Sequence, residues 1–192
     1  MKLIRSILLL SLTLLLASCG VQDIPKANNQ LDADWAEVMN QYKRRADLIP
    51  NLVSTVKGYA SHEKETLEGV VNARAKATAV NLEAKDLNPE TIQKFQQAQA
   101  GLSQALGKLM VVAEKYPDLK ANENFQALQS QLEGTENRIT IARRRYIEAV
   151  KEFNNLVTVF PTSLTNSVFF HFDKKPQFTI EESETQVPQV QF

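Results

Sequence analysis

The side chains of this sequence that could perform chemistry begin with a single thiol and two imidazoles. Cys19 is the only cysteine, so it has no internal disulfide partner and cannot by itself build a thiolate zinc site. His62 and Glu63 resemble the start of a helical zinc-protease motif, but Thr66 occupies the place of its second histidine. The other histidine, His171, lies near the C-terminus. We therefore predict no metal site, no other cofactor and no catalytic residue.

Charged residues flank Pro50. Arg44 and Asp47 are three residues apart, so they could pair on one helix face, and Arg45 lies between them. A helix break at Pro50 would expose backbone groups, and the arginines could then hold an acidic peptide or a phosphate. Alternatively, they satisfy the break and tie it to a neighbouring helix, which is the interpretation we favour.

Two other patterns suggest ligands only superficially. Arg143, Arg144 and Arg145 are successive helix residues and point about 100° apart, so a solvated face is expected, with lipid headgroups as a minor alternative. The glycine run from Gly101 to Lys108 lacks the Ser or Thr of a phosphate loop after its lysine. The 22 basic and 22 acidic residues cancel, which gives no electrostatic footprint for nucleic acid.

The N-terminus has the pattern of an export signal. Lys2 and Arg5 precede an apolar run from Ile7 to Leu16 that is too short to span a bilayer. The sequence Leu16-Ala17-Ser18-Cys19 then resembles a lipobox, in which the thiol receives diacylglycerol and the chain is cut before the cysteine. An ordinary signal peptide with a chance cysteine and an uncleaved anchor helix are the alternatives. Gly20 in place of Asp is compatible with outer-membrane sorting in a Gram-negative cell.

Apolar residues at helical spacing predict the elements that follow. The first stripe runs on both sides of Pro50 and consists of Trp35, Val38, Tyr42, Ile49, Val53, Val56, Ala60, Leu67 and Val70. The second begins after the helix-start pair Asn88-Pro89, ends at Tyr116-Pro117, and consists of Ile92, Phe95, Leu102, Leu106, Leu109, Val112 and Tyr116. The third has a period of 3.5 and consists of Leu128, Leu132, Thr135, Ile139, Ala142, Tyr146, Ala149, Phe153, Leu156 and Phe160.

These stripes predict an all-α fold, an antiparallel bundle of long helices whose first helix is interrupted at Pro50. We expect a lipoprotein signal peptide over residues 1–18, a polar tether over 19–30 and the helical bundle over 31–165. Residues 166–192 form an irregular tail that is rich in aromatic residues and then disordered. The cluster Phe169 to Phe172 could pack on the bundle or meet a partner.

Four ordered pieces of the sequence resemble the LemA family. They are Gln41 to Val53 with Thr55 to Tyr59, His62 to Leu67 leading to Ala73-Arg74, Glu114 to Asn122, and Glu136 to Ile139 with Ala142 to Tyr146. The resemblance implies an all-helical domain held at a membrane by its N-terminus, without implying a reaction. It marks as signature residues and possible contacts Arg44, Arg45, Asp47, Pro50, Asn51, Tyr116, Pro117, Arg144 and Tyr146.

This sequence departs from the family pattern in two places. Many members carry a transmembrane anchor where this chain has its lipobox, and many have Tyr-Asn where it has Tyr146-Ile147. Members often accompany membrane peptidases or other envelope proteins, which suggests envelope partners. We expect a non-enzymatic scaffold or adaptor on the periplasmic side, bound to the membrane through Cys19. The alternative is an envelope enzyme or small-ligand site around Arg44, Arg45, Asp47 and His62.

Overall fold

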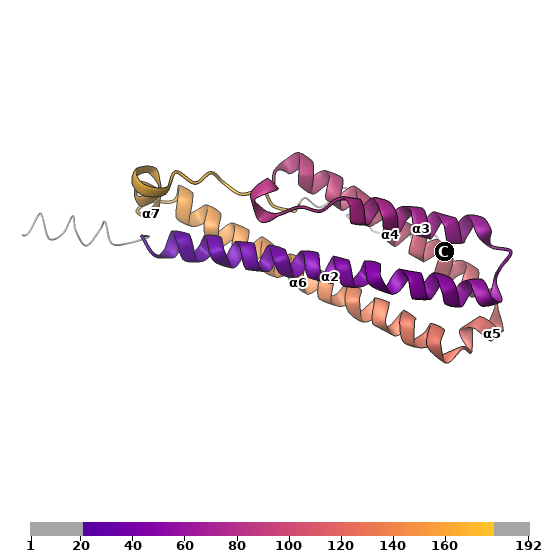
Figure 1. Ribbon diagram of the computed structural model, residues 1–192. Coiled ribbons are helices and arrows are strands. Elements are labelled where there is room, and N and C mark those ends of the chain that lie inside the picture. The colour runs from indigo at the N-terminus through magenta and orange to yellow at the C-terminus, as the bar shows by residue number, and fades with distance from the viewer. Residues whose placement is uncertain (1–20, 179–192) are drawn as a thin grey trace, which may run out of the picture.

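The computed structural model describes residues 21–178, and all regular structure in that range is helical. Helices α2 (Asp23–Tyr59) and α6 (Glu123–Thr158) run antiparallel along the molecule, each about 55 Å long at 1.5 Å per residue (Figure 1). Helix α3 (Lys64–Ala79) turns back along α2 and packs on α4 (Pro89–Ala113). The predicted all-α antiparallel bundle is confirmed.

Short elements connect and extend the long helices. They are η1 (Ala84–Asp86), α5 (Pro117–Lys120), α7 (Thr162–Thr165) and η2 (Asn166–Phe170). The predicted start of α4 is confirmed, because the side chain of Asn88 accepts a 2.9 Å hydrogen bond from the Thr91 amide and the Thr91 hydroxyl accepts one from the Asn88 amide. A cis peptide bond joins Phe160 to Pro161 before α7.

The predicted interruption at Pro50 is wrong. Helix α2 continues through this proline, and the chain turns instead between Ala60 and Glu63. Pro50 is exposed on α2, so its ring causes no packing conflict with the core.

The predicted polar tether is also wrong for the residues that the structure describes. Helix α2 begins at Asp23, and Ile24 and Ala27 are buried in the core. With Leu31 they extend the first apolar stripe by about three turns upstream of Trp35, so burial outweighs the polar composition of this segment. Residues 19 and 20 lie outside the described range.

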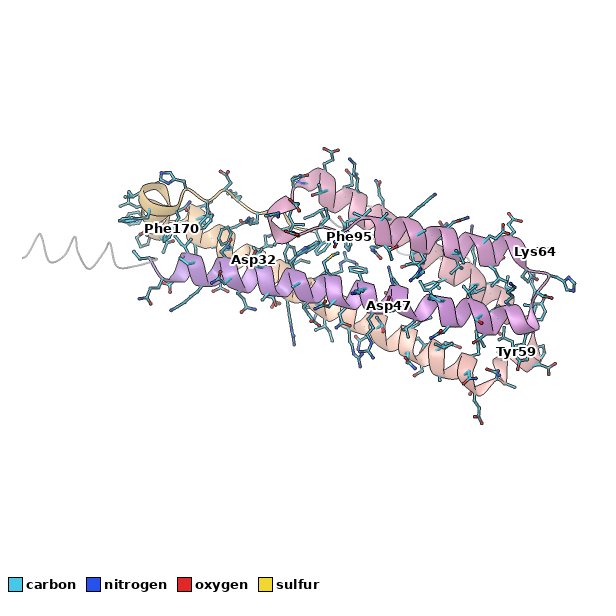
Figure 2. All side chains as sticks on the ribbon, in the orientation of Figure 1. Asp32, Asp47, Tyr59, Lys64, Phe95 and Phe170 are labelled. Atoms are coloured by element: carbon cyan, nitrogen blue, oxygen red, sulfur yellow. The ribbon has the colours of Figure 1, made fainter. Side chains whose placement is uncertain are left out.

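The buried apolar residues form two clusters along the molecule. One cluster includes Trp35, Phe95 and Phe153, and the other includes Ile49 and Leu109. A polar layer separates them, formed by Arg45, Gln99 and Thr135 in the middle of the long helices. The side chains of Asp47 and Phe95 near this level are labelled in Figure 2.

The described tail is irregular, as predicted, only after η2, which covers Asn166–Phe170, and it is attached to the bundle. After η2 the chain runs back along the molecule, and Phe178 is buried between Trp35 and Tyr146. Phe170 and Phe172 are half-buried against the same cluster, whereas Phe169 is exposed. The prediction of disorder at the C-terminus falls on residues outside the described range.

Candidate functional site

The backbone of α2 is completed at Pro50 by a residue from another helix. Pro50 has no amide hydrogen, so the carbonyl oxygen of Ala46 lacks its helical donor. The Nε atom of Arg74, on α3, donates to this oxygen at 2.7 Å. The carbonyl that Pro50 leaves without a donor is therefore satisfied by an arginine of α3, so the prediction that Arg44 and Arg45 satisfy it is wrong.

Arg45 is the centre of the polar layer and is only 1% exposed. Its Nη1 donates to Glu136 Oε1 at 2.6 Å and to Ser103 Oγ at 2.9 Å, while Nη2 donates to Gln99 Oε1 at 2.6 Å. These contacts join α2 to both α4 and α6. Arg45 therefore acts as an internal tie, and its donors point away from solvent.

Tyr42 lies directly beside this layer. The Arg45 guanidinium is 5.1 Å from the centre of the Tyr42 ring. Burial raises the pKa of the Tyr42 hydroxyl above its ordinary value, although the positive charges of Arg143 and Arg45 oppose the shift. Tyr42 therefore stays neutral in the folded protein at physiological pH.

The residues of the alternative site do not converge. Arg44, Asp47 and Asn51 are exposed on α2, and His62 is exposed in the turn at the far end of this helix. Asp47 lines a hollow of about 420 Å³ with Tyr42 and Lys43, but Arg44, Arg45 and His62 do not line it. Within residues 21–178, no three His, Cys, Asp or Glu side chains lie close enough together to share a metal ion.

Tyr116 and Pro117 lie where the helices turn at the end farthest from the N-terminus. The Tyr116 hydroxyl donates to Glu63 Oε1 at 3.0 Å, and this hydrogen bond raises the pKa of Tyr116. Pro117 begins α5, whose Leu119 is buried. These two signature residues hold the α2–α3 turn against the connection between α4 and α6.

Tyr146 is completely buried in the aromatic cluster at the other end. Its hydroxyl donates to the carbonyl oxygen of Pro176 at 3.3 Å, and its ring packs against Trp35 and Phe178. Burial, with a smaller contribution from the charge of Asp32, raises the pKa of Tyr146 strongly. Tyr146 therefore anchors the returning tail and is not available to a ligand.

The three successive arginines separate as their spacing predicts. Arg143 is half-buried, with its guanidinium 5.0 Å from the centre of the Phe178 ring. Arg144 and Arg145 are exposed. Arg144 therefore belongs to a solvated helix face, and the triplet forms no single basic patch.

Sequence reasoning missed an exposed apolar surface at the end of the bundle where α2 begins (Figure 1). We call it the apolar end surface, and it consists of Val159, Phe160, Leu164, Val168 and Phe169. Phe160 was predicted in the core but is 73% exposed, because α6 ends at Thr158. A signal was present in the sequence, since residues 153–172 contain no Asp, Glu, Lys or Arg.

Cys19 and the predicted signal peptide over residues 1–18 lie outside the described range. No helix within residues 21–178 combines the length and apolar character that crossing a bilayer requires.

Comparison with known proteins gives matches of different extent. The sequence profile of the LemA family matches residues 34–192. Protein LemA of Metamycoplasma hominis is 25% identical over 171 residues, which cover 81% of this chain and 74% of that protein. Magnetosome proteins MamQ 1 and MamQ 2 of Paramagnetospirillum magneticum are each 33% identical over 64 residues, which cover 33% of this chain and 24% of either relative.

Proposed function

This chain belongs to the LemA family, and we propose that it is a non-enzymatic scaffold of the bacterial cell envelope. In this proposal acyl chains on Cys19 hold it at a lipid surface on the periplasmic side, at the outer membrane in a Gram-negative cell. It acts by binding other envelope proteins through the outer faces of its helices.

The observation that carries the proposal is the internal use of the reactive side chains. Arg45 is buried and pairs with Glu136 at the surface of the bundle, Arg74 completes the backbone at Pro50, and Tyr146 is fully buried. Side chains that serve the fold in this way are not available for acid–base or nucleophilic catalysis. Contact through the remaining exposed faces is the function that this arrangement favours.

The shape of the molecule suits such a role. Helix α2 begins at Asp23, only four residues after Cys19, and extends for about 55 Å at 1.5 Å per residue. A lipid anchor at Cys19 would hold one end of this rod at the membrane. The opposite end, with Tyr59 and His62 exposed, would then be presented to envelope proteins well away from the lipid.

The anchor is tested by mass spectrometry of the mature protein from cells. We expect an N-terminal Cys19 that carries acyl chains, and Cys19→Ala should yield an uncleaved or released protein without lipid. Normal processing and membrane retention of Cys19→Ala would contradict the anchor.

The contact role is tested by a photo-crosslinking residue placed at one exposed position on each of three helices. Val71 on α3, Val111 on α4 and Ile141 on α6 are suitable because all three are exposed apolar residues. In living cells we expect the crosslinking residue to form a discrete adduct with another envelope protein from at least one of these three positions and from no more than two of them. Failure to obtain any protein adduct from acylated, folded variants would contradict the scaffold.

A further inference from the structure

We propose that the apolar end surface enters the lipid interface beside Cys19 and forms a second, non-covalent contact with the membrane. This inference rests on the proposed anchoring at Cys19, and it adds which part of the bundle touches the lipid.

The composition of this surface is unusual for solvent-facing residues. Its five members are more than half exposed, and Phe169 is 63% exposed. They come from the segment over residues 153–172, which has no charged residue in a chain with 23% charged residues. Charged side chains are the groups that oppose entry into a bilayer, whereas Phe and Leu favour its interfacial zone.

The surface is supported by ordered polar contacts beneath it. The Asn166 side chain donates to the carbonyl oxygen of Phe172 at 2.9 Å and accepts from the amide of Phe172 at 3.0 Å. The His171 amide donates to the Asn166 carbonyl oxygen at 2.7 Å, and His171 takes the left-handed backbone conformation that ends η2. Phe172 packs on Phe153 in the core. The fold therefore packs the Phe172 ring into the core and keeps the Phe169 ring exposed to solvent.

The inward and outward rings lie close together in the sequence. Phe170, which is half-buried and labelled in Figure 2, lies at the end of the molecule where α2 begins and stacks on Phe172. Its neighbour Phe169 faces solvent. An apolar tail that had simply collapsed on the bundle would bury both Phe169 and Phe170. The exposure of Phe169, Leu164 and Phe160 therefore indicates that another molecule covers this surface.

The position of Cys19 identifies a lipid bilayer as what covers this surface. Asp23 is four positions after Cys19, and extended chain covers at most about 3.5 Å per residue. The Cα of Cys19 must therefore lie within about 14 Å of the first residue of α2, and the acyl chains on its side chain hold the bilayer near this end of the bundle. The apolar end surface is at this same end of the bundle (Figure 1), and Val21, two residues before α2, is 41% exposed.

The test uses cysteine variants of the full chain that carry an environment-sensitive fluorophore. Phe169→Cys reports on the apolar end surface, and Val111→Cys, which replaces an equally exposed residue on α4, is the matched control. Both proteins are purified from cells and reconstituted into vesicles of phosphatidylethanolamine and phosphatidylglycerol. Emission from the buried Trp35 verifies the fold of each variant, and Leu164→Cys replaces Phe169→Cys if the latter does not fold.

We expect a nitroxide on the lipid chains to quench the label at position 169 several-fold more than the label at position 111. Aqueous iodide should show the opposite order. Equal lipid quenching at the two positions would overturn the proposal. Shielding of the label at position 169 from iodide without lipid quenching would also overturn it. In that case either residues 1–20 or a second copy of the protein would cover the surface.

Mass spectrometry of the same samples distinguishes this inference from the anchor. An acylated N-terminus without lipid quenching at position 169 refutes the apolar end surface and leaves the anchor intact. Lipid quenching at position 169 with an unacylated N-terminus supports the surface and refutes the anchor. A free Cys19 would be labelled equally in both variants, so their difference still reports on the two chosen positions.

Discussion

Arg74 donates a 2.7 Å hydrogen bond from Nε to the carbonyl oxygen of Ala46, the acceptor that Pro50 leaves without its helical donor. The donor comes from α3, 28 residues away in the sequence. A proline inside a helix costs about 3 kcal/mol relative to alanine. Part of that cost is offset here by a charged donor at the vacant carbonyl, which allows α2 to continue without a break.

Substituting Arg74 should therefore destabilise the bundle. We expect Arg74→Met to lower the free energy of unfolding by about 2 kcal/mol, because it removes a hydrogen bond from a charged donor and leaves the Ala46 carbonyl unpaired. Urea denaturation followed by circular dichroism measures the change. Arg44→Met, at an exposed position on α2, is the control and should change stability by less than about 0.5 kcal/mol.

The coupling between Arg74 and Pro50 is a separate prediction. In a Pro50→Ala background, residue 50 gains an amide hydrogen that can bond to Ala46. Arg74→Met should then cost about 1 kcal/mol less than it does in the wild-type chain. An equal cost in both backgrounds would show that Arg74 acts through some other contact.

The polar layer at Arg45 predicts non-additive substitutions. Arg45→Met should lower the free energy of unfolding by about 3 kcal/mol, because it leaves the buried Gln99 amide and Glu136 without their donor. Gln99→Leu alone removes the side-chain oxygen that accepts a hydrogen bond from Arg45 Nη2. The double variant should be more stable than the sum of the two single effects predicts, because it leaves neither the Gln99 side-chain oxygen without its donor nor the Arg45 guanidinium without this acceptor. Additive free energies would contradict the role of Gln99 as a partner of Arg45.

Stability should decline in alkaline solution, and Tyr146 should account for part of the decline. Burial raises the pKa of its hydroxyl in the folded protein, while the unfolded chain keeps the usual value of about 10. The stabilising contribution is therefore complete below pH 10 and is lost as the pH rises above it. We expect Tyr146→Phe to show a shallower decline of unfolding free energy above pH 10. Phe169→Ala, which removes an exposed ring without a titratable group, should keep the slope of the wild-type protein.

The attachment of the tail can be tested at Phe178. This ring is buried against Trp35 and Tyr146, with ring centres 5.9 and 5.4 Å away. Phe178→Ala should cost about 3 kcal/mol and shift Trp35 fluorescence to longer wavelength, because water gains access to the indole. Phe169→Ala, at the exposed ring, should leave both the emission and the stability nearly unchanged. A similar spectral shift in both variants would contradict the packing.

The long helices could be predicted because their apolar residues repeat at helical spacing. The same rule, applied further upstream, would have found Ile24, Ala27 and Leu31, but polar residues between them suggested a tether. It would also have placed Arg45 in the core, since Arg45 follows Tyr42 by three residues and precedes Ile49 by four.

The role of Pro50 could not be predicted in this way. Local rules describe what a proline removes from a helix, but the compensating donor lies on another helix and becomes visible only when α3 packs on α2. The apolar end surface was missed for a different reason. Phe160 continues the apolar repeat, yet α6 ends two residues before it, so the repeat extends beyond the helix that it describes.

The ion pair between Arg45 and Glu136 also fixes the register of the two longest helices. Apolar residues that repeat every seven positions would permit α6 to slide along α2 by one heptad with little loss of packing. A slide in one direction would bring Arg143 beside Arg45 and oppose two cations, and a slide in the other would bring Gln129, which has no charge. A single charged layer thus selects one alignment of two helices whose apolar contact residues alone would permit several.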